Sequence, residues 1–251
     1  MKVDIHGANI LYTIHVSDSI NINITSSIVI TWGLMIVLTA LSIWATHDLK
    51  TKNISKKQAV VEWLYNFIDN LVGTVMGAKW KRFVPFVGTI MIGSITMSLS
   101  SLLGLFPPTG DFMTIFAWSV TVFVIITKTK IQSQGLGSYL KGFLDPVFIL
   151  APINVMSECF TPVSMAFRHF GNVLSGVVIT SLIYSALGAL NSFIFSFIPG
   201  AAGGLLQVVP IFELGGPAVI SLYFDWFSGA IQAYIFCMLT MIFISQAAGE
   251  E

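Results

Sequence analysis

The fold is decided by residues 147–198, VFILAPINVMSECFTPVSMAFRHFGNVLSGVVITSLIYSALGALNSFIFSFI. This stretch is almost continuously apolar, and the residues that break it are Pro152, Glu158, Pro162, Arg168 and His169. A membrane crossing needs about 20 mostly apolar residues to pass a hydrocarbon core of about 30 Å. One continuous helix here would be about 78 Å long at about 1.5 Å per residue. We therefore expect a crossing that is steeply tilted, broken at its prolines, or both.

The rest of the chain has the same apolar character. Of its 251 residues, 55% are hydrophobic and 10% are charged, whereas soluble domains average about 25% charged residues. This composition excludes a soluble globular protein. Twelve Lys and Arg balance twelve Asp and Glu, so no basic excess is present to bind nucleic acid.

Further apolar segments lie on both sides of the first stretch. We expect an outer N-terminal segment over 1–26, a span over 27–46, a helical hairpin over 84–106 and 112–127, and a second long segment over 205–246. The 112–127 segment is short for a span unless its flanks extend it. The sequence thus predicts an all-α polytopic membrane protein, with residues 1–251 forming a single membrane domain. It has about five membrane-embedded helices, and the last two form a long, steeply tilted hairpin.

The basic residues are distributed unevenly between the loops. Ten of the twelve lie within residues 50–82 and 128–141. Short loops rich in Lys and Arg stay on the cytoplasmic side of a membrane. We therefore expect the N-terminus and the turn at 107–111 to lie outside, and the C-terminus to lie in the cytoplasm.

Residues 58–76 have a different pattern. Polar residues such as Glu62, Asn66 and Asp69 recur at three- and four-residue steps, while Trp63 and Phe67 belong to an apolar opposite face. This spacing is typical of an amphipathic helix that lies in the membrane interface. The lysines that flank it place it on the cytoplasmic surface.

Arg168 is a charge deep inside an apolar segment. A charged side chain at the centre of a span costs about 2.5–3.5 kcal/mol on insertion scales, and Arg does not lose its proton. A further apolar stretch follows it, so its side chain cannot reach the interface easily. We therefore expect Arg168 to face a partner or a water-filled cavity.

Polar residues form a stripe on each of the two long segments. The stripe around Arg168 contains Thr161, Ser164, Arg168, Asn172 and Ser175, which share one helical face. The stripe on the last segment contains Ser221, Asp225, Ser228 or Gly229, and Gln232. Two such stripes indicate a hydrated path or a polar contact between helices, since Ser, Thr and Gln also join helices within membranes.

Three carboxyl groups lie along the same two segments. Glu158 is on the cytoplasmic side of Arg168, and Glu213 and Asp225 are on the outer side. Partly desolvated carboxyls near a fixed cation are suited to exchanging protons near neutral pH. Acids on both sides of a fixed cation predict two half-paths that do not join.

Five short motifs follow one another in order. They are LGLFPPT at 103–109, GFLDP at 142–146, PINVMSE at 152–158, FRHFGNVLSG at 167–176 and QAYIF at 232–236. Together they resemble subunit a of bacterial F-type ATP synthase. In that family the subunit is the stator beside a rotating ring of small hairpin subunits, and a peripheral stalk holds the complex together.

The resemblance implies a function and a location. The chain would provide two offset half-channels for protons or sodium ions in a bacterial plasma membrane, coupled to ATP synthesis, with no active site, cofactor or metal of its own. Arg168 matches the family's essential arginine, which attracts an ionised ring carboxylate and blocks leakage between the half-channels. Asn172 and Gln232 match polar residues beside it.

The chain departs from the family pattern at three positions. Val177 stands where many relatives carry an acid, nine residues after the arginine. Asp225 stands where His or Glu is common, so the outer relay would rest on Asp225. His169 stands where Leu is usual, and it is either a second relay group or a packed imidazole.

Two other classes of function compete with this interpretation. A secondary transporter could bind an anionic substrate through Arg168, but it predicts discontinuous helices and an internal repeat, and the sequence has no evident repeat. An intramembrane hydrolase would use Ser175 and His169. These two residues are separated by about 600° of helical turn and so lie on different faces. Cys159 and Cys237 have no metal-ligand spacing.

Overall fold

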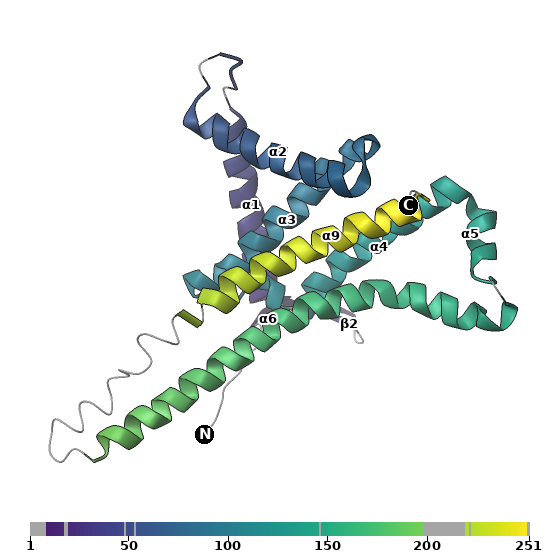
Figure 1. The fold of residues 1–251 in the computed structure, drawn as a ribbon. Coiled ribbons are helices and arrows are strands. Elements are labelled where there is room, and N and C mark those ends of the chain that lie inside the picture. The colour runs from purple at the N-terminus through teal and green to yellow at the C-terminus, as the bar shows by residue number, and fades with distance from the viewer. Residues whose placement is uncertain are drawn as a thin grey trace.

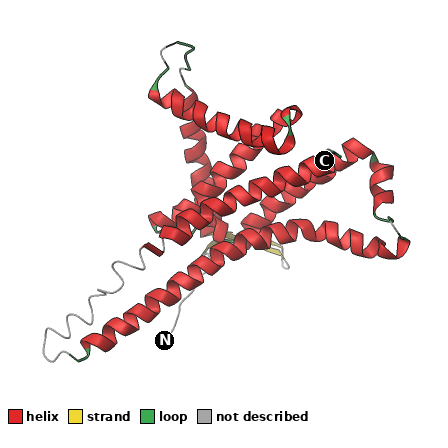
Figure 2. Cartoon of the chain, viewed as in Figure 1, coloured by secondary structure: helices red, strands yellow, loops and turns green. Residues whose placement is uncertain are grey.

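The computed structural model describes residues 9–17, 20–47, 49–52, 54–145, 147–197, 219–220 and 222–249. Within these residues, five helices are long and apolar enough to cross a membrane: Ser26–Thr46, Ala78–Leu103, Phe112–Gln134, Phe148–Phe195 and Trp226–Ala247. Figure 2 shows a chain dominated by helices. The prediction of an all-α polytopic membrane protein is confirmed.

A short β-hairpin precedes the first long helix. Strands β1 (Ile10–Ser17) and β2 (Ile20–Thr25) pair antiparallel, and α1 (Ser26–Thr46) follows directly. The hairpin is absent from the sequence predictions, although the alternation ININIT in β2 has the two-residue period of a strand. Ser27 is the single buried residue of α1, so almost the whole surface of this helix is available to lipid or to other subunits.

Helix α2 (Lys56–Met76) corresponds to the predicted amphipathic helix. The Ser55 side chain caps it by accepting a hydrogen bond from the Gln58 backbone N–H at 3.2 Å. Its apolar residues serve two surfaces: Ile68 and Val72 are buried within the protein, whereas Trp63 is exposed. The helix therefore packs on the bundle along one edge and leaves an apolar edge open. The 3-10 helix η1 (Ala78–Phe83) then leads into the bundle.

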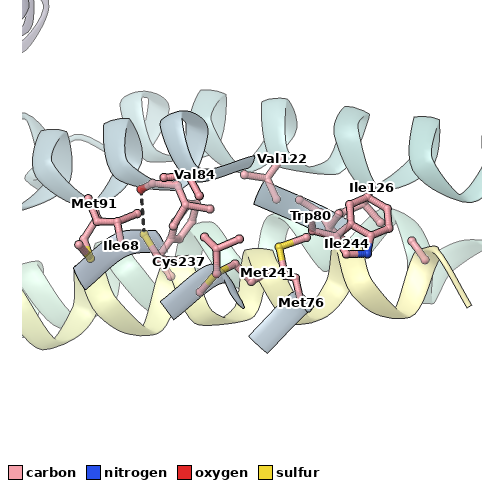
Figure 3. Close-up of a cluster of buried hydrophobic side chains, with 14 of the residues drawn as sticks. Ile68, Met76, Trp80, Val84, Met91, Val122, Ile126, Cys237, Met241 and Ile244 are labelled. Carbon is pink, nitrogen blue, oxygen red and sulfur yellow. Dashed lines mark hydrogen bonds between the residues drawn. The ribbon is translucent and has the colours of Figure 1, made fainter. Parts of the chain in front are cut away.

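The core lies where α2, α3 (Val84–Leu99), α4 (Phe112–Gln134) and α9 (Gly229–Ala247) meet. Two 3-10 helices, η2 (Ser100–Leu103) and η3 (Pro108–Gly110), connect α3 to α4. Figure 3 shows the side chains that fill the core, among them Ile68, Met76, Trp80, Val84, Met91, Val122, Ile126, Cys237, Met241 and Ile244.

Helix α4 is longer than the predicted 112–127 segment. It continues through Lys128 and Lys130 to Gln134, where Gly135 adopts a positive φ of 81° that favours glycine. The extra turns supply the length that the apolar residues alone lack. They also place Lys128 and Lys130 on a helix, although the sequence predicts these lysines in a loop.

The long helix α6 (Ala151–Phe195) follows α5 (Leu136–Gly142) and the 3-10 helix η4 (Phe148–Leu150). It is one helix of 45 residues, about 68 Å long at about 1.5 Å per residue. Pro152 lies in its first turn, where proline is tolerated, and Pro162 lies inside it. Figure 1 shows α6 as a continuous, bent helix. The expectation that this segment is broken at its prolines is therefore wrong.

The last segment contains an irregular turn. A π-helix, η6 (Tyr223–Ser228), precedes α9, which lies beside α6 and α4 (Figure 1). Turns of π-helix are rare in proteins, and those that occur are often found at functional sites. Residues 205–218 of the predicted 205–246 segment lie outside the described residues.

Candidate functional site

Arg168 lies on an exposed face near the middle of α6. The aromatic rings on either side of it, Phe167 and Phe170, contact Phe112 at the start of α4, with ring centroids 4.8 Å and 5.6 Å away. These contacts hold this part of α6 against the end of the α3–α4 hairpin. No described residue forms a hydrogen bond or ion pair with Arg168. The site thus presents a fixed positive charge outward, on a largely apolar surface.

Asn172, one turn beyond Arg168, joins α6 to η6. Its Nδ2 donates to Ser228 Oγ at 2.8 Å, and Ser228 Oγ donates to Asn172 Oδ1 at 3.1 Å. The two predicted polar stripes therefore meet at this pair. Asn172 forms hydrogen bonds with Ser228 and none with Arg168. Its influence on the Arg168 guanidinium is therefore indirect, through the position of α6.

Two glycines permit close packing around this pair. A Cβ added to Gly176 would lie 3.3 Å from the Phe224 Cβ, and one added to Gly229 would lie 2.9 Å from the Ser98 Cβ. A larger residue at Gly229 would force a neighbouring helix to shift, whereas one at Gly176 would require Phe224 to give way by a few tenths of an ångström. Gly176 therefore sets the spacing between α6 and η6, and Gly229 sets the spacing between α9 and α3.

The other polar residues of the predicted site are dispersed. Gln232 is buried on α9, and the exposed Ser175 hydroxyl donates to the Asn172 carbonyl of its own helix at 2.9 Å. Asp225 belongs to η6, but its side chain lies outside the described part of the structure. Glu213 also lies outside the described residues.

His169 points away from Arg168 into the bundle and is 1% exposed. Its Nε2 lies 3.4 Å from Ser94 Oγ of α3, and its ring meets Phe236 of α9 edge-on at 5.7 Å. Its Nδ1 has no hydrogen-bond partner among the described residues. These contacts favour the packed imidazole over the second relay group.

We expect His169→Leu to retain ion flux within about twofold of wild type, because Leu preserves most of the apolar packing. Flux measured in vesicles that contain the assembled complex would test this expectation. His169→Gln, which keeps a polar group at the position, is the matched control. A large loss of flux in the Leu variant alone would instead assign His169 to the relay.

Glu158 forms an ion pair that sequence reasoning missed. Lys130 Nζ on α4 donates to Glu158 Oε1 at 3.1 Å and to Oε2 at 3.3 Å. The Tyr139 hydroxyl on α5 also donates to Oε1 at 3.3 Å. Partial burial and then the neighbouring carboxylate raise the pKa of Tyr139, which keeps this phenol protonated as a donor. Glu158, which the sequence predicts as an acid on the cytoplasmic side of Arg168, thus accepts hydrogen bonds from two donors.

Two adjoining cavities connect this cluster with Arg168. The first, of about 510 Å³, is lined by Lys130, Tyr139 and Glu158 among others. The second, of about 300 Å³, is lined by Ser164 and Arg168 among others. Both are bounded by Ser157, Thr161 and Phe243. A groove with polar groups at both ends therefore runs along α6 between Glu158 and Arg168.

On the other side of Arg168, a small cavity of about 20 Å³ lies between Thr109 at the end of the α3–α4 hairpin and Val177 on α6. It has room for about one water molecule. Nearby, Ser98 Oγ lies 3.3 Å from Thr109 Oγ1. Among the described residues, the cavity beside Arg168 on the Glu158 side is therefore much larger than the one near Val177.

The described residues contain no cluster of His, Cys, Asp or Glu suited to a metal ion. Unbroken α6 also differs from the discontinuous helices that the transporter alternative predicts. What the arrangement offers chemically is a fixed cation at the end of a polar groove, accessible from a neighbouring protein surface.

Comparison with known proteins gives consistent matches over most of the chain. The model of the family described as ATP synthase A chain matches residues 28–245. ATP synthase subunit a of Albidiferax ferrireducens is 32% identical, over 90% of this chain and 87% of that protein. The Moorella thermoacetica subunit a is 31% identical, over 89% of this chain and 91% of that protein. A relative described as sodium ion specific, from Propionigenium modestum, is 26% identical over 90% of this chain and 75% of its own length.

Proposed function

This chain belongs to the ATP synthase A chain family, and we propose that the groove along α6 is its cytoplasmic half-channel, which Arg168 closes at the rotating ring. The chain is a multi-pass membrane subunit of the ATP synthase complex. It is the stator ion-channel subunit, which couples ion translocation to ATP synthesis.

The observation that carries this proposal is Arg168, which is exposed at the end of the groove and has no partner among the residues that the structure describes. A permanent cation on an apolar helix face is unfavourable in a membrane unless it meets an anion or water. A ring of small hairpin subunits, each with a carboxylate at membrane depth, would present such an anion at every step. The groove would supply the water that receives the released ion.

In the proposed cycle, ions enter from outside near Asp225 and Glu213 and neutralise a ring carboxylate. The ring then carries them through the lipid. When the carboxylate reaches Arg168, its attraction for the guanidinium favours the ionised form, and the ion leaves along the groove toward Glu158. One charge that moves through about 100 mV releases about 2.3 kcal/mol, so several ions must pass for each ATP.

The partners and the location follow from the same proposal. We place the chain in a bacterial plasma membrane, with the N-terminus outside and the C-terminus in the cytoplasm, because the lysine-rich loops are expected inside. The ring would contact the exposed face of α6. A peripheral stalk would use other exposed apolar surface, for which α1 is available.

Co-purification tests the proposal directly. The tagged chain, extracted in mild detergent, should bring with it a small two-helix ring subunit, a peripheral-stalk subunit and ATP hydrolysis activity. A chain that purifies alone and transports a small anion in vesicles would favour the transporter alternative.

We expect Asp225→Asn to slow ion flux about tenfold while the complex stays assembled. The substitution removes one titratable group from the proposed outer path but keeps its size. Glu213, proposed for the same path, keeps its carboxyl, so the loss should be smaller than the about 10²-fold of an essential acid–base group. Flux driven by a potential across vesicles measures the effect, with Asp225→Glu as the control that restores the carboxyl. An unchanged rate in the Asn variant would place the outer relay elsewhere.

A further inference from the structure

Three helices bring together a cluster at the end of the groove farthest from Arg168. We define it as the mouth cluster: Lys130 of α4, Tyr139 of α5 and Glu158 of α6. Its residues are up to 28 positions apart in sequence, and all three line the cavity of about 510 Å³. The proposed function assigns a role to Glu158 but none to Lys130 or Tyr139.

Lys130 occupies both oxygens of the Glu158 carboxylate, at 3.1 Å and 3.3 Å. The ammonium also lies 5.4 Å from the centroid of the Tyr139 ring, within the range of a cation–π interaction. Side-chain exposure is 34% for Lys130 and 16% for Glu158, so the carboxylate is the more enclosed partner. Within this ion pair the positive charge of Lys130 offsets the negative charge of Glu158.

The same cavity contains other oxygen ligands. Ser157, Gln134 and Gln246 line it. Asn154 also lines it, and its Nδ2 is bonded to the carbonyl oxygens of Phe143 and Asp145 at 3.0 Å and 2.9 Å. Hard cations prefer oxygen ligands such as carboxylate, amide and hydroxyl groups, and this one cavity is lined by residues that carry all three. A cation at this position would need the Glu158 carboxylate as a ligand, and Lys130 already donates to both of its oxygens.

We propose that Lys130 is a specificity-determining residue of the cytoplasmic half-channel, which keeps sodium ions from binding at Glu158 and so leaves this path to protons. The inference rests on the proposed function, because it requires ions to leave along the groove. Acidic side chains attract cations in pores, whereas fixed positive groups exclude them. A proton passes the same site through water and hydroxyl groups, without a coordination shell of its own.

The test compares proton flux with and without sodium in vesicles that contain the complete membrane sector. Flux is driven by a potassium diffusion potential, in either about 100 mM sodium chloride or about 100 mM choline chloride. Wild type should give the same flux in both salts. Lys130→Gln exposes the carboxylate, and a sodium site with a Kd of about 10 mM would then reduce flux about tenfold in sodium.

Two control variants separate this effect from general damage. Lys130→Arg keeps the ion pair and should stay insensitive to sodium. The double variant Lys130→Gln with Glu158→Gln removes the carboxylate and should lose the sodium sensitivity of the single variant. If Lys130→Gln does not assemble, Lys130→Met, which keeps an apolar stem against Tyr139, gives the same comparison.

Two results would overturn the inference: equal flux of the Lys130→Gln variant in both salts, or a sodium effect that persists in the double variant. Wild-type flux that is itself suppressed by sodium, or that requires it, would also overturn it. Failure of the proposed function is a separate result, in which wild-type vesicles show no flux that depends on Arg168.

Discussion

Replacement of Arg168 by Ala should abolish coupled ion pumping. The Arg168 guanidinium is the permanent charge at the end of the groove farthest from Glu158, and no described residue could replace it there. Removal of one partner from a buried ion pair costs about 3–5 kcal/mol. The pair that Arg168 would form with a ring carboxylate within the membrane is of this kind, so the release step should slow by more than about a hundredfold. The loss of the charge also removes the barrier between the two half-paths, so ions should leak without turning the ring.

Vesicles that carry the variant complex measure both effects, by ATP-driven acidification and by passive flux. Arg168→Lys is the matched control, because it keeps the charge but loses the planar, bidentate geometry of the guanidinium. We expect it to block leakage while it pumps slowly. Since Arg168 is exposed in the isolated chain, the amount of assembled complex should change little. Full coupled pumping by the Ala variant would refute the role of Arg168.

The second large effect is expected from Gly229→Ala. The added methyl would lie 2.9 Å from the Ser98 Cβ, closer than two carbon atoms can approach without movement of a helix. Overpacking of this kind costs about 1–3 kcal/mol. The strain falls next to Ser228, whose bond with Asn172 joins η6 to α6, so both stability and ion flux should fall. Thermal unfolding of the purified complex in detergent measures the stability.

Gly33→Ala is a suitable control for this experiment. Gly33 also lies inside a long helix, α1, but a Cβ there would meet nothing within 4 Å. The change should be neutral or stabilising by about 0.5–1 kcal/mol, because Ala favours the helix. Equal unfolding midpoints for the Gly33 and Gly229 variants would show that the contact between α3 and Gly229 is not strained by a methyl group.

The membrane helices could be predicted from sequence because their signal is local. Any run of about 20 apolar residues predicts a span, and a charge within such a run, such as Arg168, stands out without knowledge of the fold. The lengths were less predictable where polar residues continue a helix. Lys128 and Lys130 look like loop residues by hydropathy, yet they extend α4 by two turns.

The contacts between helices were not accessible from the sequence. Glu158 and Lys130 are 28 residues apart, and Asn172 and Ser228 are 56 apart. Nothing in the local pattern states which polar residues will meet, since crossing positions depend on how side chains of both helices pack. For that reason the sequence predicts Glu158 as a proton-exchanging acid but not its ion pair with Lys130, and the resemblance places Asn172 beside Arg168 but not its bonds with Ser228.

The unbroken helix α6 has a mechanical consequence. In the proposed function a turning ring pushes the stator sideways at each step, and that force would act on Arg168, near the middle of a 45-residue helix. A helix in two pieces would yield at the break. A single helix passes the load to the contacts that support it, among them the ring contacts of Phe112 beside Arg168 and the Asn154 bonds near its first turn. In the proposed function α6 would therefore transmit the torque of the motor to the rest of the subunit as one continuous helix.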